Sequence, residues 1–223
     1  MAQSIKALRP FASCDIGDAL VRLQHPYAGY LQDLRMWSPR VAGTHGLGQA
    51  PTMIGEATTV TMVHENDESQ AKPSKHFADN NQAGKVMVIK QPENAISACF
   101  GGLMGTRATQ LGAAGVVIDG RFRDILEMQD MGFPVFAKGI SILGSNTFTR
   151  TTALDEPVRF SSGPTVFPGD IVVGDSDGVV VVPTKLVDQV AQICHERKEI
   201  DDKMLKALQA GASMSETVAK FRK

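Results

Sequence analysis

The stretch GGLMGTRATQLGAAGVVIDGRFRD, residues 101–124, decides the fold of this chain. Gly101 and Gly102 carry no Cβ, so the backbone there can turn sharply and a ligand can come close. Residues 103–111 have a helix-compatible composition, and the glycines that follow end the predicted helix. The apolar, β-branched residues 116–118 then predict a short buried strand. The order of turn, helix and strand is typical of an α/β protein.

Arg123 and Asp124 follow this strand, after a turn predicted at Asp119 and Gly120. They would lie at the carboxyl end of the strand, where open α/β sheets bind ligands. The N-terminus of the helix offers N–H groups to an anion, and an arginine can bind a carboxylate through two parallel hydrogen bonds. An aspartate can coordinate Mg²⁺. This set suits a small 2-oxo acid. The Arg-Asp dipeptide alone favours a surface salt bridge in an ordinary βαβ unit, whereas the whole arrangement favours a site.

Gly102, a gap of twenty residues and Arg123-Asp124 resemble the signature of one family. It comprises 4-hydroxy-4-methyl-2-oxoglutarate aldolases and regulator-of-ribonuclease-activity-A-like (RraA-like) proteins. Further matches, in the family's order, are SCDIGDAL at 13–20, FPVFAKG at 133–139, PGD at 168–170 and GDSDGVV at 174–180. The chain is most similar to the subset, including fungal members, with glycine where the bacterial aldolases have aspartate at the position of Gly102. That departure removes one acidic group from the water shell of the metal.

The resemblance implies an α/β fold of the swivelling β/β/α type, with a parallel βαβ unit, a β-rich C-terminal half and closing helices. It also implies homotrimers or dimers of trimers. The implied activity is that of a divalent-metal-dependent carbon–carbon lyase on pyruvate-containing 2-oxo acids. Such enzymes cleave 4-hydroxy-4-methyl-2-oxoglutarate or 4-carboxy-4-hydroxy-2-oxoadipate, or decarboxylate oxaloacetate, through a metal-stabilised pyruvate enolate. The cofactor would be Mg²⁺, Mn²⁺ or another divalent cation.

The family's site residues carry over by position. Asp124 is the implied metal ligand, and Arg123 binds substrate. In the family, a C-terminal glutamate reaches the neighbouring subunit's site; Glu199 matches best by position, with Glu196 as its rival. The predicted catalytic residues are thus Arg123, Asp124 and Glu199. The predicted substrate-binding residues are Gly101, Gly102, Leu103, Met104 and Arg123.

Other functions remain open at this point. One is a non-catalytic, oligomeric, protein-binding regulator of the ribonuclease-regulator type, with a vestigial site. Another takes residues 101–105 as a loop for a methyl donor or a dinucleotide, although the full GxGxxG fingerprint is absent. Lys90 and Lys138 keep a Schiff-base mechanism open. Glu127 is a conceivable residue of the metal's outer shell, contacting its ligands and not the metal itself. His64 and His76 are usable acid–base groups.

Composition limits the function classes. The 223 residues show no repeat and no long linker, so a single domain over 1–223 is expected. The 23 basic and 24 acidic residues nearly cancel, which does not suggest a nucleic-acid partner. Cys14, Cys99 and Cys194 have no CxxC spacing and favour a reducing compartment. Without a signal-peptide core or a run of about 20 apolar residues, a cytoplasmic protein off the membrane is expected.

The remaining pattern predicts the other elements. We expect loops over 25–51 and 64–75, and a tight hairpin at 175–178 in preference to a calcium loop. Ser13 or Asp15 should cap the second helix, Thr184 the long one, and Ser213 or Ser215 the last. Expected helices are 4–11, 16–23, 77–82, 103–111, 125–131 and 184–206. Expected strands are 54–63, 85–90, 116–118, 134–137, 171–173 and 179–182, of which 85–90, 116–118 and 134–137 should pair in parallel.

Overall fold

The computed structural model describes residues 2–40 and 52–222; residues 41–51 of the predicted 25–51 loop, including His45, lie outside them. The strands of the main sheet are β1 (Arg35–Ser38), β2 (Met53–His64), β3 (Lys85–Lys90), β4 (Gly115–Phe122), β5 (Val135–Ile140), β6 (Thr149–Leu154), β9 (Ile171–Asp175) and β10 (Gly178–Val182). The helices are α1 (Ala2–Leu8), α2 (Ser13–Arg22), α3 (Gly102–Gln110), α4 (Ile125–Met131), α5 (Val187–Gln209) and α6 (Met214–Phe221). Short 3-10 turns are η1 (Pro26–Gly29), η2 (Phe77–Asn80) and η3 (Thr184–Leu186), and β7 (Val158–Arg159) pairs with β8 (Thr165–Val166).

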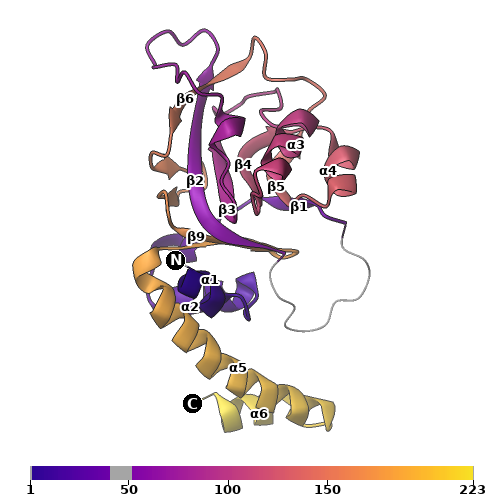
Figure 1. The fold of residues 1–223 in the computed structure, drawn as a ribbon. Helices are drawn as coiled ribbons and strands as arrows, with labels where there is room; N and C mark the ends of the chain where they lie inside the picture. Colours follow the sequence, from indigo (N-terminus) through magenta and orange to yellow (C-terminus); the bar gives the residue numbers. More distant parts are fainter. Residues whose placement is uncertain (1, 41–51, 223) are drawn as a thin grey trace.

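The main sheet is mixed, nearly closed and barrel-like, in the order β1-β5-β4-β3-β2-β9-β10. Strands β2, β3, β4 and β5 run parallel, which confirms the predicted parallel unit. The other edge of β2 is shared: its first residues pair with β9 and its last residues with β6, both antiparallel. The carboxyl ends of β3, β4 and β5 therefore meet at one edge of the sheet, where α3 and α4 begin (Figure 1).

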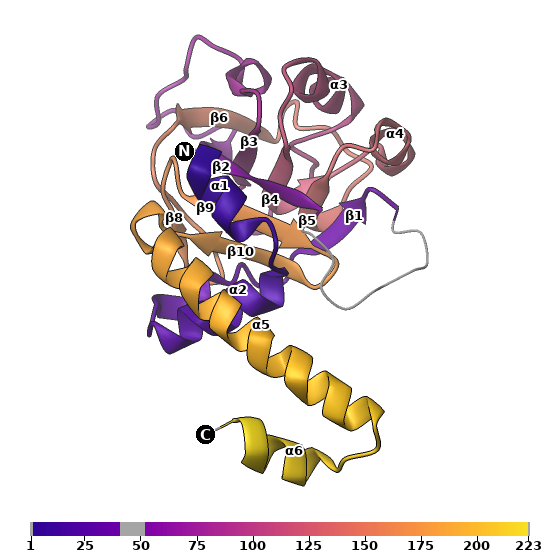
Figure 2. The same ribbon diagram turned by 60° about the horizontal axis from the view of Figure 1, so that its bottom comes forward.

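Helices cover two regions of the sheet. Helices α3 and α4 lie side by side on one face of β3, β4 and β5, over a core that includes Ile118, Phe122 and Met128 (Figure 1). Helices α1, α2 and the first half of α5 gather beside β9 and β10 around a second core (Figure 2). The opposite face of the parallel strands packs under β7 and β8, with Val88 and Phe136 in that third core.

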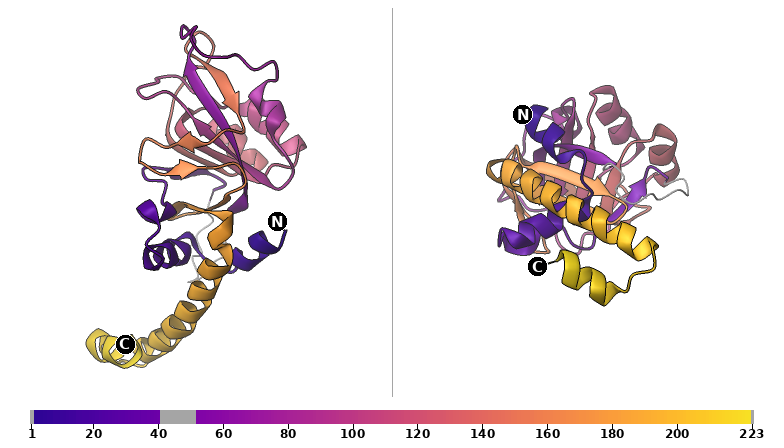
Figure 3. Two further views of the ribbon diagram at one scale, coloured as in Figure 1. Left: turned by 90° about the vertical axis from the view of Figure 1, so that its left-hand side faces the viewer. Right: turned by 90° about the horizontal axis from the view of Figure 1, so that it is seen from below.

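Helix α5 leaves the body of the molecule. Most of its buried residues, including Val187, Val190 and Cys194, lie in the first third, with Met204 buried farther along. The rest of the helix extends outward as a rod with α6 folded back at its end (Figure 3). α6 begins at the predicted cap: Ser213 Oγ accepts a hydrogen bond of 3.2 Å from Glu216 N. No helix within residues 2–40 or 52–222 is both long and apolar enough to span a lipid bilayer.

Several local predictions were wrong. Asp119 and Gly120 do not turn the chain but continue β4 to Phe122. The second helix begins at Ser13 with Ala12 as its N-cap, because the Ser13 hydroxyl donates instead to Asp175 at 2.7 Å; Asp15 accepts from the Ala12 N–H.

Two further differences concern long-range contacts. The Thr184 hydroxyl does not cap α5 but donates to the Gly169 carbonyl at 2.9 Å, and η3 precedes the helix. Strand β1 lies within the predicted 25–51 loop, where pairing with β5 orders it. The β-rich C-terminal half meets the parallel unit as expected: β9 and β10 continue its sheet through β2, and β7 and β8 pack on one of its faces.

Candidate active site

The predicted site lies where the last residues of β4 meet the first turn of α3. The N–H of Arg123 donates to the Phe100 carbonyl at 3.0 Å, and the N–H of Cys99 donates to the Arg121 carbonyl at 2.9 Å. These bonds tie the segment before α3 to the end of β4. As a result, Gly101 and Gly102 lie against Arg123 and Asp124, as the sequence predicted.

Asp124 lies in the short connection between β4 and α4 and is the N-cap of α4. Its backbone is left-handed, with φ of 64° and ψ of 48°, a conformation that aspartate tolerates better than most residues. Its Oδ2 accepts a hydrogen bond of 2.8 Å from the N–H of Gly102, and the side chain remains 31% exposed. One carboxylate oxygen is thus fixed by the helix N-terminus, while the other is free to meet a ligand.

The two glycines are required by close approach. A methyl group on Gly101 would lie 2.6 Å from Oδ2 of Asp124, and one on Gly102 would lie 1.7 Å from Oε2 of Glu127. Both distances are far shorter than a van der Waals contact. The Glu127 carboxylate therefore occupies the space in which a side chain at position 102 would begin, and the Asp124 Oδ2 is only 3.5 Å from the same point. Two carboxylates converge at the start of α3.

Sequence reasoning undervalued Glu127. Its position on α4, one turn after Asp124, was visible, but its approach to Gly102 depends on the packing of two helices. That packing is close because Gly105 also lacks a side chain: a Cβ there would lie 2.6 Å from the sulfur of Met128. Small residues at positions 102 and 105, on one face of α3, were the available signal.

Arg123 presents a cation beside these acids. Its Nε lies 3.5 Å from Oδ2 of Asp124, its side chain is 45% exposed, and its guanidinium extends toward Gly144. In the first turn of α3, the N–H groups of Leu103 and Met104 have no hydrogen-bond acceptor among the described residues. Free N–H groups at a helix N-terminus and a guanidinium fork both favour a carboxylate ligand.

Glu199 is not brought to this site within one chain. It lies on the projecting part of α5, on the far side of the body from α3 and α4 (Figure 1). Its rival Glu196 is occupied by Arg22 at 3.6 Å and by Gln192 at 3.1 Å, whereas Glu199 has no ion pair among the described residues.

The donor set fits a hard cation with few protein ligands. Within the described part of the chain, no three His, Cys, Asp or Glu side chains come together as a metal cage. Mg²⁺ commonly binds through one or two carboxylates and keeps several waters. Asp124, with Glu127 beside it, offers that arrangement of carboxylates.

The remaining candidates have other roles. Burial raises the pKa of Cys99 and Cys194 to about 12, and burial raises the pKa of Cys14 as well, so none is a ready nucleophile. His76 caps η2 by accepting a hydrogen bond from Ala78 N. Lys90 and Lys138 meet at Asp119, on the other face of the sheet from α3 and α4.

Comparison with known proteins agrees with this architecture. The family model described as RraA-like, Aldolase/RraA, matches residues 13–181. A relative from Halalkalibacterium halodurans, named as a proposed 4-hydroxy-4-methyl-2-oxoglutarate aldolase, is 31% identical over 156 residues. That alignment covers 70% of this chain and 71% of the relative.

Solved structures match over nearly the whole chain. An uncharacterised protein from Pseudomonas syringae has a TM-score of 0.84 at 23% identity, covering 99% of this chain and 95% of that one. Streptomyces coelicolor RraAS2, described as an unusual member of the RNase ES inhibitor RraA family, has a TM-score of 0.76 at 22% identity, with coverage of 91% and 96%. At such identities these structures support the fold alone. The family match over residues 13–181 shows that this chain belongs to the RraA-like family.

Proposed function

We propose that this protein is a divalent-metal-dependent lyase that cleaves a carbon–carbon bond in pyruvate-containing 2-oxo acids. The observation that carries the proposal is the convergence of Arg123, Asp124 and the free N–H groups of α3 at one sheet edge. Candidate reactions are aldol cleavage of 4-hydroxy-4-methyl-2-oxoglutarate or 4-carboxy-4-hydroxy-2-oxoadipate, and decarboxylation of oxaloacetate. The name of the Halalkalibacterium halodurans relative supports the first of these.

Each group at the site has a proposed role. Arg123 and the N–H groups of Leu103 and Met104 bind the substrate carboxylate and set its orientation. Asp124 holds Mg²⁺ or Mn²⁺, which when bound supplies Lewis-acid polarisation of the 2-oxo group. Aldol cleavage and decarboxylation both release a pyruvate enolate, so one arrangement of residues can serve both reactions.

Glu127 supplies the second acid. The aldolases that this chain resembles carry aspartate at the position of Gly102, and here the Glu127 carboxylate fills that space from the neighbouring helix. An acid at this point can accept hydrogen bonds from waters beside Asp124 and fix their orientation. We propose that α4 thereby compensates for the missing side chain on α3.

We also propose that the full site includes residues of a second subunit. Leu103 on α3 and Leu126 on α4 adjoin the site residues, Ile142 lies in the loop after β5, and their side chains are 90%, 63% and 94% exposed. A homotrimer or a dimer of trimers would cover these side chains. It would also allow Glu199 of one subunit to approach Asp124 of another, which the projecting α5 favours.

Removal of the metal tests the proposal. We expect EDTA to abolish release of pyruvate from oxaloacetate, and Mg²⁺ or Mn²⁺ to restore it, because in the proposed mechanism the metal polarises the 2-oxo group. Free metal also decarboxylates oxaloacetate slowly, so the control is the Asp124→Asn protein at the same metal concentration. Full turnover by metal-free protein would reject the mechanism. Absence of turnover on all three 2-oxo acids would favour the alternative of a protein-binding regulator.

Moving the acid between helices tests the role of Glu127. Glu127→Ala should weaken Mn²⁺ binding by about ten- to a hundredfold, which is the usual loss when a residue that hydrogen-bonds to the metal's ligands is removed. Adding Gly102→Asp to Glu127→Ala should recover most of the affinity, because the acid returns to the same space. Titration of Mn²⁺ by calorimetry measures both changes. Asp130→Ala, which removes another exposed acid of α4, is the matched control. Unchanged Mn²⁺ affinity in Glu127→Ala would assign Glu127 a packing role only.

A further inference from the structure

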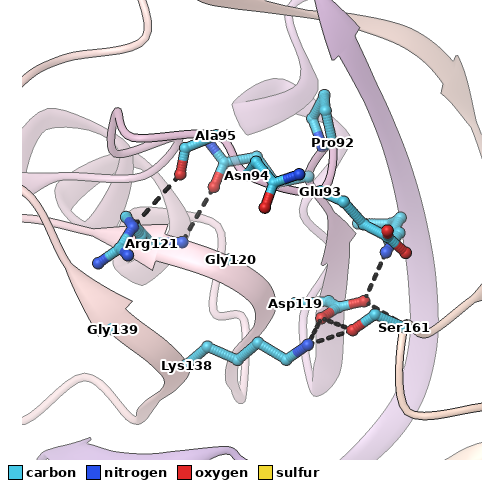
Figure 4. Close-up of a pocket in the computed structure, with 12 residues that line it drawn as sticks. Pro92, Glu93, Asn94, Ala95, Asp119, Gly120, Arg121, Lys138, Gly139 and Ser161 are labelled. Atoms are coloured by element: carbon cyan, nitrogen blue, oxygen red, sulfur yellow. Dashed lines mark hydrogen bonds and ion pairs between the residues drawn. The ribbon is translucent and has the colours of Figure 1, made fainter.

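A second cavity lies at the carboxyl ends of β3, β4 and β5, outside the site just described (Figure 4). Its volume is about 360 Å³, within the range of small-molecule sites. Its walls come from the three strand ends, the loop that follows β3, and Ser161. Arg123, Asp124 and Glu127 are not among the lining residues.

The cavity opens on the face of the sheet opposite to α3 and α4. Lys90, Asp119 and Lys138 each lie two positions after a residue of the core under β7 and β8, and side chains two apart on a strand share a face. Those core residues are Val88, Val117 and Phe136. The cavity and the Arg123–Asp124 site therefore use opposite faces of the same sheet edge.

Asp119 is the centre of the cavity wall. Its oxygens lie 2.9 Å from Nζ of Lys90 and 2.6 Å from Nζ of Lys138, and they accept hydrogen bonds of 2.8 and 2.9 Å from the N–H and hydroxyl of Ser161. Burial alone would raise the pKa of this carboxyl, but Lys138, Ser161 and Lys90 together hold the pKa below its usual value. Asp119 is therefore ionised and already fully hydrogen-bonded.

The charges around the cavity do not cancel. One buried carboxylate faces two ammonium groups, so one positive charge is left over. Arg121 adds another: its guanidinium donates only to the carbonyls of Ala95 and Ile140, and it has no carboxylate partner among the described residues. Glu93 and Arg121 are both exposed at the rim, where solvent screens their opposite charges, so the excess that remains is that of the two lysines over Asp119. The side chains of Lys90 and Lys138 are only partly exposed, so water stabilises their excess positive charge less than it would at the surface.

We propose that this cavity binds a small oxyanion, through a carboxylate or phosphate group, against Lys90 and Lys138. The two ammonium groups are bridged by Asp119 on one side, and their unused N–H groups are available to a second anion. A cation would meet net positive charge, and an apolar ligand would leave the remaining N–H groups of Lys90 and Lys138 without acceptors. The proposal does not depend on the lyase activity, because the cavity shares no residue with the Arg123–Asp124 site.

Binding of two probe anions tests the proposal on the intact protein. Inorganic phosphate and malonate are titrated by calorimetry in EDTA and low chloride, so that no metal bound at Asp124 can recruit either anion. We expect saturable binding of at least one, and the stronger of the two identifies the preferred group. Lys138→Gln and Lys90→Gln should each weaken it by about tenfold or more. Lys85→Gln, at the other end of β3 and paired with Glu56, should leave it unchanged.

The Asp119→Asn variant tells whether the network around Asp119 binds an anion or only stabilises the fold. It keeps the side-chain shape but removes the negative charge, so it should lower thermal stability and tighten phosphate or malonate binding. A network that serves only to hold Ser161 against the sheet would lose stability with no gain in affinity. If Lys138→Gln does not fold, Lys90→Gln and Asp119→Asn still decide the matter. No saturable binding up to about 10 mM, or binding lost in Arg123→Gln but retained in the lysine variants, would overturn the proposal.

Discussion

Replacing Asp124 by asparagine should abolish metal-dependent cleavage of 2-oxo acids while leaving the fold intact. Asparagine has nearly the same shape and can still accept the hydrogen bond from Gly102 N, but it lacks the charge that holds a divalent ion. Lewis-acid stabilisation by a metal is worth several kcal/mol, so kcat should fall by about a thousandfold or more. Steady-state release of pyruvate at saturating Mg²⁺ measures the loss.

Two measurements make this result interpretable. Thermal unfolding should change little, because Asp124 is a partly exposed side chain whose backbone geometry asparagine also tolerates. Mn²⁺ titration should show weakened binding in parallel with the loss of activity. Near-normal turnover in Asp124→Asn would place the metal elsewhere and remove the main support for the proposed mechanism.

Mixed oligomers should reveal whether Glu199 acts between subunits. Glu199→Ala and Asp124→Asn proteins should each be inactive alone, because each lacks one half of every shared site. Refolded together in equal amounts, random rings should recover about a quarter of the wild-type activity, since one interface in four pairs an intact Asp124 with an intact Glu199. Pyruvate release after mixing gives this fraction directly.

The control for this experiment is another glutamate on the same helix. Glu196→Ala removes the partner of Arg22 and should keep its activity, since that carboxylate is already occupied within its own chain. Native mass spectrometry confirms that mixed rings have formed. Mixed rings without any recovered activity would reject a site shared in this way.

The parts of the fold set by local pattern were predictable. The bounds of β3 follow from a short apolar run and those of α4 from the segment between two predicted strands, and the structure has the predicted bounds. Asp119-Gly120 looked like a turn because that dipeptide usually forms one. Here Asp119 is held in the strand by Lys90 and Lys138, from strands distant in sequence, and no local rule contains that information.

In the candidate site, too, some residues could be predicted from the sequence, whereas others depend on tertiary packing. Arg123 and Asp124 could be found from the sequence because they are adjacent and follow a strand, and the glycines before α3 indicated a close approach. The position of Glu127 could not be derived, because it depends on how near α4 packs to α3. The approach of Lys90 to Lys138 was equally hidden, since the two lysines belong to different strands and each alone looks like a solvated side chain.

The shared edge of β2 has a consequence for biosynthesis. Met53 pairs with Gly174, so the first residues of β2 stay without that hydrogen-bonded neighbour until the ribosome has made β9. The parallel strands and both acids of the candidate site emerge well before then. During that interval a nascent chain carries an open apolar strand edge, the kind of surface that chaperones cover and that aggregates form from. Slow translation between β5 and β9 would prolong this exposure.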